Sequence, residues 1–270
     1  MSATTSPLGP ITRAILKSLW DKLFDPTSPI YLPTIIKNGS SSLGLPSYDP
    51  ATFTGRSKKF PIANVPPNVV SQACTDDDPI PPVGSDPTLS LGDVLMKNLS
   101  NMAQGPMTFS TTKPEVSIEV TVGSTAIPFT LEAVDEKTPN FFFNVDCCAP
   151  ESNTSNKCKK NWNTSANGQF TAKVDSFTIS ITAQLNMPPN ANYTITILDV
   201  SLQAKPTDIH VDPKVNSLPK WAQSLVNIAV QEGVNTNAIT DVIQAFLNQP
   251  SVKGDMEKLI NQELAKIPII

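Results

Sequence analysis

The sequence predicts an α+β protein built on a long, highly curved antiparallel sheet, with helices at both ends of the chain. Three observations lead to this fold class. Apolar and polar residues alternate through segments 116–133 and 170–204, as strands with one buried face require. Apolar residues recur at helical spacing near the N-terminus and again after residue 220. The helical segments stand before and after the strands and do not alternate with them, which is typical of α+β proteins.

The first helix is expected within residues 1–25. Pro10 suits the first turn of a helix, and Pro26 ends it because the residue before a proline is displaced from the helical region. One face carries an apolar stripe, formed by Ile11, Ile15, Leu16, Leu19, Trp20, Leu23 and Phe24.

Residues 26–87 form a proline-rich segment with twelve of the 26 prolines of the chain. Proline cannot donate a ladder hydrogen bond, so long regular strands are excluded here. We expect an ordered but irregular segment with short strands, because Tyr31, Ile35 and Phe60 give it side chains to bury. A disordered linker is the alternative.

The antiparallel sheet is expected over residues 88–212. Two alternating runs, 116–122 and 127–133, flank Gly123-Ser124 and predict a β-hairpin. The alternation changes phase at Asp175-Ser176 and again at Ile197-Leu198. Such changes indicate β-bulges, which bend and twist long strands, and they are the reason for predicting strong curvature.

Residues 213–270 are expected to be helical. Three apolar stripes lie within residues 221–229, 239–247 and 252–267, and Ser251 is the expected cap of the last helix. No sharp boundary divides the chain, so the prediction is one domain over residues 1–270.

The chemistry of the sequence excludes several functional classes. The 20 basic and 24 acidic residues give a net charge of −4 and form no basic stripe, which excludes nucleic acid as the main partner. No nucleotide-binding motif or metal-ligand spacing is present. The one histidine, His210, stands between Asp208 and Asp212, where a hydrolase could use it as a base. A strand with a polar outer face explains these residues better, so we expect no catalytic residue, cofactor or metal.

Cysteines and location stay open at the level of the sequence. Cys74, Cys147, Cys148 and Cys158 allow two disulfides, with Cys148–Cys158 or Cys147–Cys158 favoured, or four free thiols. Neither a signal peptide nor a run of about 18 apolar residues is visible. We therefore expect a soluble protein, in the cytoplasm rather than in a leaderless or processed secreted form.

Two small basic clusters bear on membrane contact. One combines Arg56, Lys58 and Lys59, and the other combines Lys157, Lys159 and Lys160. Solvated polar loops are the first interpretation, and transient contact with anionic lipid headgroups is the alternative.

Several segments together resemble a known family. Residues 170–181 and 197–202 are similar to the paired long strands of the tubular lipid-binding superfamily, which includes the bactericidal/permeability-increasing-like proteins. Residues 245–261 are similar to its helical tails, and residues 89–94 and 99–102 to a further strand. The resemblance covers about residues 88–267. It implies a curved sheet wrapped around a long helix, an apolar channel for acyl chains, and neither catalysis nor a metal.

The predicted function is therefore the non-enzymatic binding or carrying of a lipid or other apolar small molecule in a channel between the curved sheet and the helices. The alternative is a structural or interaction module without a cavity, such as a toxin-complex or assembly component with a protein partner. The inward residues of the strands and helices are the predicted ligand contacts, namely Phe170, Phe177, Ile179, Ile181, Ile195, Ile197, Leu225, Ile228, Ile243 and Phe246.

Overall fold

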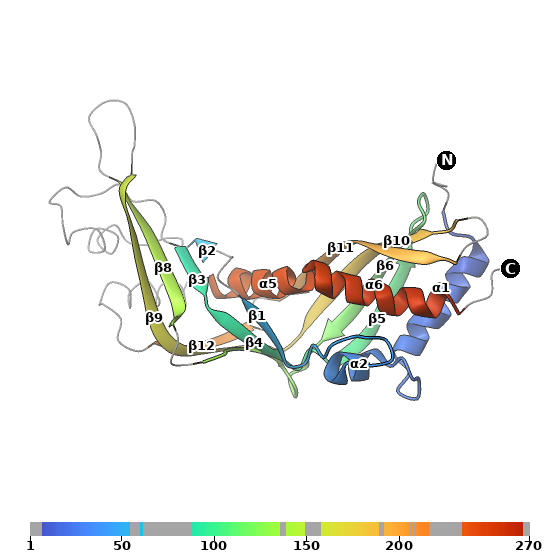
Figure 1. The fold of residues 1–270 in the computed structure, drawn as a ribbon, viewed down its shortest axis with the longest axis horizontal. Coiled ribbons are helices and arrows are strands. Elements are labelled where there is room, and N and C mark those ends of the chain that lie inside the picture. The colour runs from blue at the N-terminus through green and yellow to red at the C-terminus, as the bar shows by residue number, and fades with distance from the viewer. Residues whose placement is uncertain are drawn as a thin grey trace, which may run out of the picture.

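The structure, a computed structural model, describes residues 7–54, 60–61, 88–135, 139–148, 158–188, 192–205, 207, 209–215 and 234–266 of the chain. It confirms the predicted fold class, because the described strands form two antiparallel sheets against which helices pack (Figure 1). Figure 1 shows the smaller sheet and the C-terminal helix at one end of an elongated molecule, and the paired strands β8 and β9 at the other.

The smaller sheet has four antiparallel strands in the order β11 (Thr194–Ala204), β10 (Phe177–Asn186), β6 (Glu115–Val122) and β5 (Met102–Phe109). Burial alternates strictly along β6 and β10, so each strand turns one apolar face inward. In the pairing of β10 with β11 the register shifts beside Leu198, which is 46% exposed. This bulge confirms the phase change predicted at Ile197-Leu198.

The larger sheet has eight strands, seven of which form one continuous path. Its main path runs through β1 (Ala51–Thr54), β4 (Asp93–Lys97), β7 (Phe129–Ala133), β9 (Cys158–Val174), β8 (Pro139–Cys148), β3 (Thr88–Leu91) and β2 (Phe60–Pro61). The eighth strand, β12 (Ile209–Val215), pairs with β9. Its core side chains are closely packed, since Val94, Met96 and Leu131 have no exposed surface.

The β-hairpin predicted over residues 116–133 is wrong. β6 pairs with β5 and β10, whereas β7 pairs with β4 and β9, so the two alternating runs belong to different sheets. The chain crosses from the smaller sheet to the larger one between β6 and β7. Alternation indicates which face of a strand is buried, but it does not identify the strand's neighbours.

The chain crosses back between β9 and β10, at Asp175-Ser176, so the phase change there marks a change of sheet and not a bulge. The two crossings lie against each other. Gly123 has φ +81°, and a Cβ on it would lie 2.8 Å from the Asp175 carbonyl oxygen, so this contact requires glycine. The rings of Phe129 and Phe177 meet edge to face beside it, with centroids 5.2 Å apart.

The described helices agree with the predicted stripes. α1 (Pro10–Leu23), α5 (Val234–Leu247) and α6 (Pro250–Leu264) form where apolar residues recur at helical spacing. Ser251 is not the cap of α6, because Pro250 occupies the first turn and Gln249 takes the cap position. The helix expected at residues 221–229 lies outside the described residues.

The proline-rich segment also contains a helix that the sequence interpretation missed. α2 (Leu32–Asn38) has Pro33 in its first turn, where the missing N–H of proline costs nothing. β1 and β2 are the short strands expected in this segment. The rest of it, residues 55–59 and 62–87, is outside the described part of the chain.

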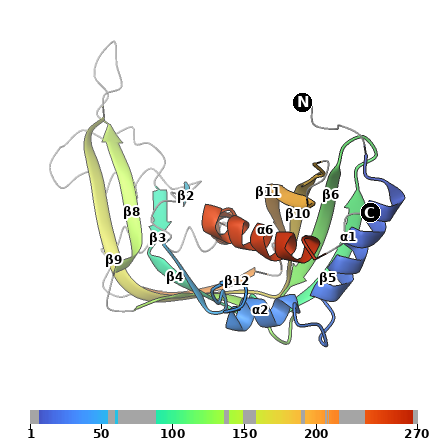
Figure 2. The same cartoon turned by 45° about the vertical axis from the view of Figure 1, so that its right-hand side comes forward.

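Both edges of the smaller sheet are covered by helices (Figure 2). At the β5 edge, Trp20 of α1 donates its indole N–H to the Gly105 carbonyl at 3.1 Å. At the β11 edge, the Asn261 side chain of α6 accepts from the Ile195 N–H at 2.6 Å and donates to the Ile195 carbonyl at 3.2 Å. Side chains of the helices thus replace a neighbouring strand.

The remaining features predicted from the sequence are only partly described. Cys148 lies opposite Cys158 in the register of β8 and β9, and His210 of β12 lies opposite Lys173 of β9. The side chains of the four cysteines, of His210 and of both basic clusters lie outside the described residues, so those predictions remain predictions. No helix within the described ranges has the length and hydropathy needed to span a membrane.

Candidate functional site

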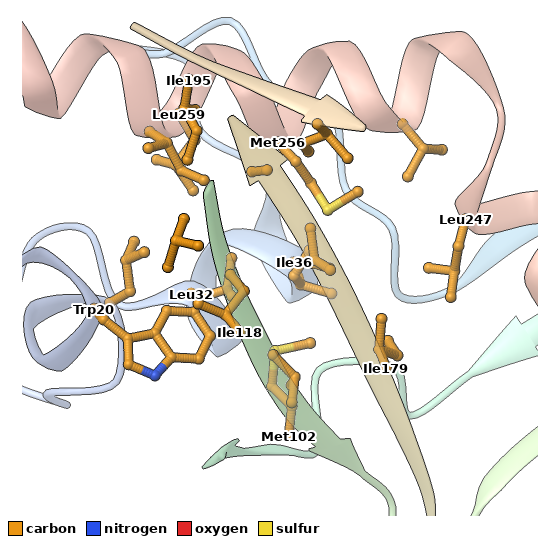
Figure 3. Close-up of a pocket in the computed structure, with 18 of the residues that line it drawn as sticks. Trp20, Leu32, Ile36, Met102, Ile118, Ile179, Ile195, Leu247, Met256 and Leu259 are labelled. Carbon is orange, nitrogen blue, oxygen red and sulfur yellow. The ribbon is translucent and has the colours of Figure 1, made fainter. Parts of the chain in front are cut away.

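A cavity lies between the inward face of the smaller sheet and the helices that pack over it (Figure 3). The cavity has a volume of about 110 Å³, or about 1140 Å³ when the space at its open side is included. Every residue that lines it is apolar or aromatic.

The sheet forms one wall through its inward residues. Because successive side chains of a strand point to opposite faces, the residues of β6 and β10 that reach the cavity are alternate ones: Val116, Ile118 and Val120 in β6, and Ile179, Ile181 and Ala183 in β10. The residues of this wall are Met102, Met107, Val116, Ile118, Val120, Ile179, Ile181, Ala183, Ile195 and Ile197.

Helices and two connecting segments form the other wall. The lining residues of α1 are three or four positions apart, which places them on one face of the helix, and the lining residues of α6 have the same spacing. Figure 3 shows Trp20 entering from α1, Leu32 and Ile36 from α2, and Met256 and Leu259 from α6. The full helical set is Leu16, Leu19, Trp20, Leu23, Leu32, Ile36, Phe246, Leu247, Val252, Met256, Leu259 and Ile260, joined by Tyr48 and Leu99.

The two lining side chains with a polar end use it elsewhere. The Trp20 N–H is bound to Gly105, as described above, and the Tyr48 hydroxyl donates to the Asp255 carboxylate at 2.5 Å. Burial, together with this hydrogen bond, raises the pKa of Tyr48 well above its ordinary value of 10. Tyr48 is therefore neutral at physiological pH, and neither polar group is free to bind a ligand inside the cavity.

The segment that carries Tyr48 is tied to α6 and α5. Besides the bond from Tyr48 to Asp255, the Lys258 ammonium donates to the Gly44 carbonyl at 3.4 Å. The ring of Phe246 lies between Tyr48 and Phe53, with centroid distances of 6.0 and 6.2 Å. These contacts hold the proline-rich segment over the cavity.

Five of the predicted ligand contacts line this cavity: Ile179, Ile181, Ile195, Ile197 and Phe246. Two more are buried in the core but are not among its lining residues: Phe177, which packs on Phe129, and Ile243 of α5. Phe170 lies in β9 with its side chain outside the described residues, and Leu225 and Ile228 lie wholly outside them. A role in ligand binding remains a prediction for all ten.

The lining residues of α1, α2 and β5 were not predicted. The α1 stripe was visible in the sequence, but nothing in it indicated that it would face the same space as the strands. β5 was missed because Gly105-Pro106 interrupts it, although the pairing of Met102 and Met107 with β6 continues on both sides.

Comparison with known proteins gives similarity at the level of structure only. No family model matches the chain, and no curated protein matches it. Takeout 1 of Epiphyas postvittana is similar in structure with a TM-score of 0.46 and 14% identity, over 94% of this chain and 93% of that one. A lipopolysaccharide binding protein is similar with a TM-score of 0.30 and 13% identity, over 98% of this chain and 42% of that one.

The present chain thus spans less than half the length of the lipopolysaccharide binding protein. The likeness is one of fold, and we draw the function from the cavity alone.

Proposed function

We propose that this protein binds or carries a lipid or another apolar small molecule, without catalysis, in the cavity between the smaller sheet and the helices. The observation that carries this proposal is the composition of the wall: all lining residues are apolar or aromatic. A cavity of this kind favours an apolar occupant because its walls supply dispersion contacts and no hydrogen bonds.

Water is a poor occupant of this space. A buried water molecule needs two to four polar partners, and the two polar groups nearest the cavity are already hydrogen-bonded to Gly105 and Asp255. Leaving the apolar wall in contact with water also costs about 25 cal/mol of free energy for each Å² of exposed apolar surface. An aliphatic or similarly apolar ligand removes this cost for the surface that it covers.

The ligand is expected to keep any polar group outside the cavity. No charged side chain of the described residues lines the cavity, and the Tyr48 hydroxyl is held by Asp255. A charged headgroup placed inside would lose its hydration without compensation. We therefore propose an apolar body inside, and a polar end, where the ligand has one, at the open side.

Among the predicted contacts, we propose that Ile179, Ile181, Ile195, Ile197 and Phe246 touch the ligand, because they line the cavity. None of these side chains can act as a nucleophile, acid or base. This supports the proposal of a binding protein.

The direct test is to purify the full chain from cells, extract it with organic solvent and identify the extract by mass spectrometry. We expect co-purifying lipid, and we expect the delipidated protein to bind the apolar dye N-phenyl-1-naphthylamine with a rise in its fluorescence. Protein that carries no extractable apolar molecule and does not bind the dye would instead favour the structural or interaction module.

A pair of matched variants ties binding to this cavity. Ala183 of β10 lines the cavity, whereas Ala103 of β5 is exposed outside it. Ala183→Phe places a ring in the cavity and is expected to abolish dye binding while the protein stays folded. Ala103→Phe makes the same chemical change outside the cavity and is expected to bind normally. Equal binding by both variants would place the ligand elsewhere.

A further inference from the structure

Three of the six methionines of the chain converge on the cavity: Met102 and Met107 from β5, and Met256 from α6. All three are partly exposed, whereas Met96 in the larger sheet has no exposed surface. Figure 3 shows Met256 reaching from the helix towards the strands and Met102 reaching from the opposite side, with both sulfur atoms at the cavity. These sulfur atoms therefore belong to the wall that a ligand would touch.

A β-bulge brings both methionines of β5 to this wall. Met102 and Met107 are five residues apart, so a regular strand would turn them to opposite faces. The register shift between Gln104 and Met107 adds one residue to β5 and pairs Met107 with Ile118. Gly105 permits this, because a Cβ there would lie 2.5 Å from the Glu119 carbonyl oxygen.

Among the described lining residues, methionine is the type that a mild oxidant converts from apolar to polar. A peroxide oxidises the thioether by two electrons: a sulfur–oxygen bond forms, the peroxide O–O bond breaks, and the second peroxide oxygen leaves as water. The resulting sulfoxide is a hydrogen-bond acceptor. The indole N–H of Trp20 and the hydroxyl of Tyr48 are both engaged, so no free donor of the lining residues can satisfy it.

We propose that Met102, Met107 and Met256 form a peroxide-sensitive site that switches the cavity out of its ligand-binding state. The inference rests on the proposed function, because the property that is switched is ligand binding. Sulfoxides in the wall oppose an apolar ligand through the cost of an unpaired polar group. By thermodynamic reciprocity, a bound ligand opposes oxidation, since it covers the same sulfur atoms.

The test uses delipidated full-length protein, hydrogen peroxide, and N-phenyl-1-naphthylamine as the probe. Peptide mapping by mass spectrometry measures sulfoxide at each methionine over time. We expect sulfoxide at Met102, Met107 and Met256 but not at buried Met96, and slower oxidation of the three when the probe is bound. Met187 is partly buried outside the cavity, so the probe should leave its oxidation rate unchanged. Oxidised protein should bind the probe with about tenfold lower affinity.

Two variants test whether oxidation of these three sulfur atoms causes the loss of probe affinity. The triple variant Met102→Leu, Met107→Leu, Met256→Leu keeps an apolar wall of similar volume but has no sulfur to oxidise, so its affinity for the probe, whatever its untreated value, should not change on peroxide treatment. Met187→Leu should remain sensitive. A triple variant that still loses affinity on peroxide treatment overturns the proposal, as does unchanged affinity after the three sulfoxides have formed.

Loss of the circular dichroism spectrum on oxidation also overturns the proposal, because the lost binding then reports unfolding. Failure of the proposed function has a different signature: the untreated protein then binds neither probe nor lipid. Unoxidised protein that binds, together with oxidised protein that binds equally well, refutes the switch and leaves the proposed function intact.

Discussion

The two sheets of this protein share one sequence pattern and differ in what lies against them. In the larger sheet Leu131 and Ala172 have no exposed surface. In the smaller sheet the corresponding inward residues, such as Ile181 and Ala183, line a cavity. Alternation marks the buried face of β6 and β10 in the smaller sheet and of β4 in the larger one, but only the elements packed against that face determine whether the space is filled.

The largest expected effect comes from removing core volume in the two sheets. Leu131→Ala leaves a new void in a packed region and should lower the free energy of unfolding by about 4 kcal/mol. Ile181→Ala enlarges a space that already exists and should cost about 2 kcal/mol. Urea denaturation of both variants measures the difference. Leu198→Ala, at the exposed bulge, is the control and should stay within about 0.5 kcal/mol of the parent. Equal losses for Leu131→Ala and Ile181→Ala would mean that the smaller sheet is packed as tightly as the larger one.

The next largest effect is expected at the β11 edge of the smaller sheet, where Asn261 of α6 binds the backbone of Ile195. Asn261→Leu keeps a side chain of similar size but leaves the N–H and carbonyl of Ile195 without their partner, at a cost of about 2 kcal/mol. Hydrogen exchange of the Ile195 amide should accelerate in the same variant. Asn261→Asp is the comparison variant: it retains an acceptor for the Ile195 N–H but turns a charged oxygen towards the Ile195 carbonyl, so the amide should exchange more slowly than in Asn261→Leu. An unchanged exchange rate in Asn261→Leu would show that α6 does not protect this edge.

The smallest effect concerns the contact between the proline-rich segment and α6. Tyr48→Phe removes the hydrogen bond to Asp255 and should cost about 1 kcal/mol. Because the pKa of Tyr48 is raised in the folded protein, its contribution to stability is present below about pH 10 and falls as the pH rises further. The stability gap between parent and variant should therefore narrow at alkaline pH.

The control for this pH dependence is Tyr193→Phe, since Tyr193 packs against the core as a partly buried residue. Urea denaturation at neutral pH and above pH 10 gives the comparison for both variants. A gap for Tyr48→Phe that persists or widens at alkaline pH contradicts the assigned role of the hydroxyl.

Much of the fold could be predicted because the spacing of apolar residues along the chain indicates helices, strands and bulges. The stripes predicted for α1, α5 and α6 lie inside the observed helices or run at most three residues past them, and the exposed bulge at Leu198 appears in the sequence as a change of phase. Pairing could not be predicted in the same way. Residues 116–133 look like a hairpin, yet the positive φ of Gly123 and its contact with Asp175 direct the chain into the other sheet.

The sheet side of the site was more predictable than the helical side. Ile179, Ile181, Ile195 and Ile197 follow from alternation, whereas Phe246 is the one helical lining residue among the predicted contacts. Met107 does not, because its direction depends on a bulge that a Gly-Pro pair conceals. The cavity itself depends on how far α1, α2 and α6 stand from the strands, and that distance is a property of packing between segments far apart in the chain.

The covered edges of the smaller sheet affect whether copies of the protein can aggregate through that sheet. An open strand edge beside an apolar wall is a template on which other chains add as strands and aggregate. Here α1 covers one edge and α6 the other, and the same two helices wall the cavity. The smaller sheet can therefore border a hollow apolar interior without offering other copies of the protein an open strand edge. Truncation before α6 would remove this protection and the cavity wall together.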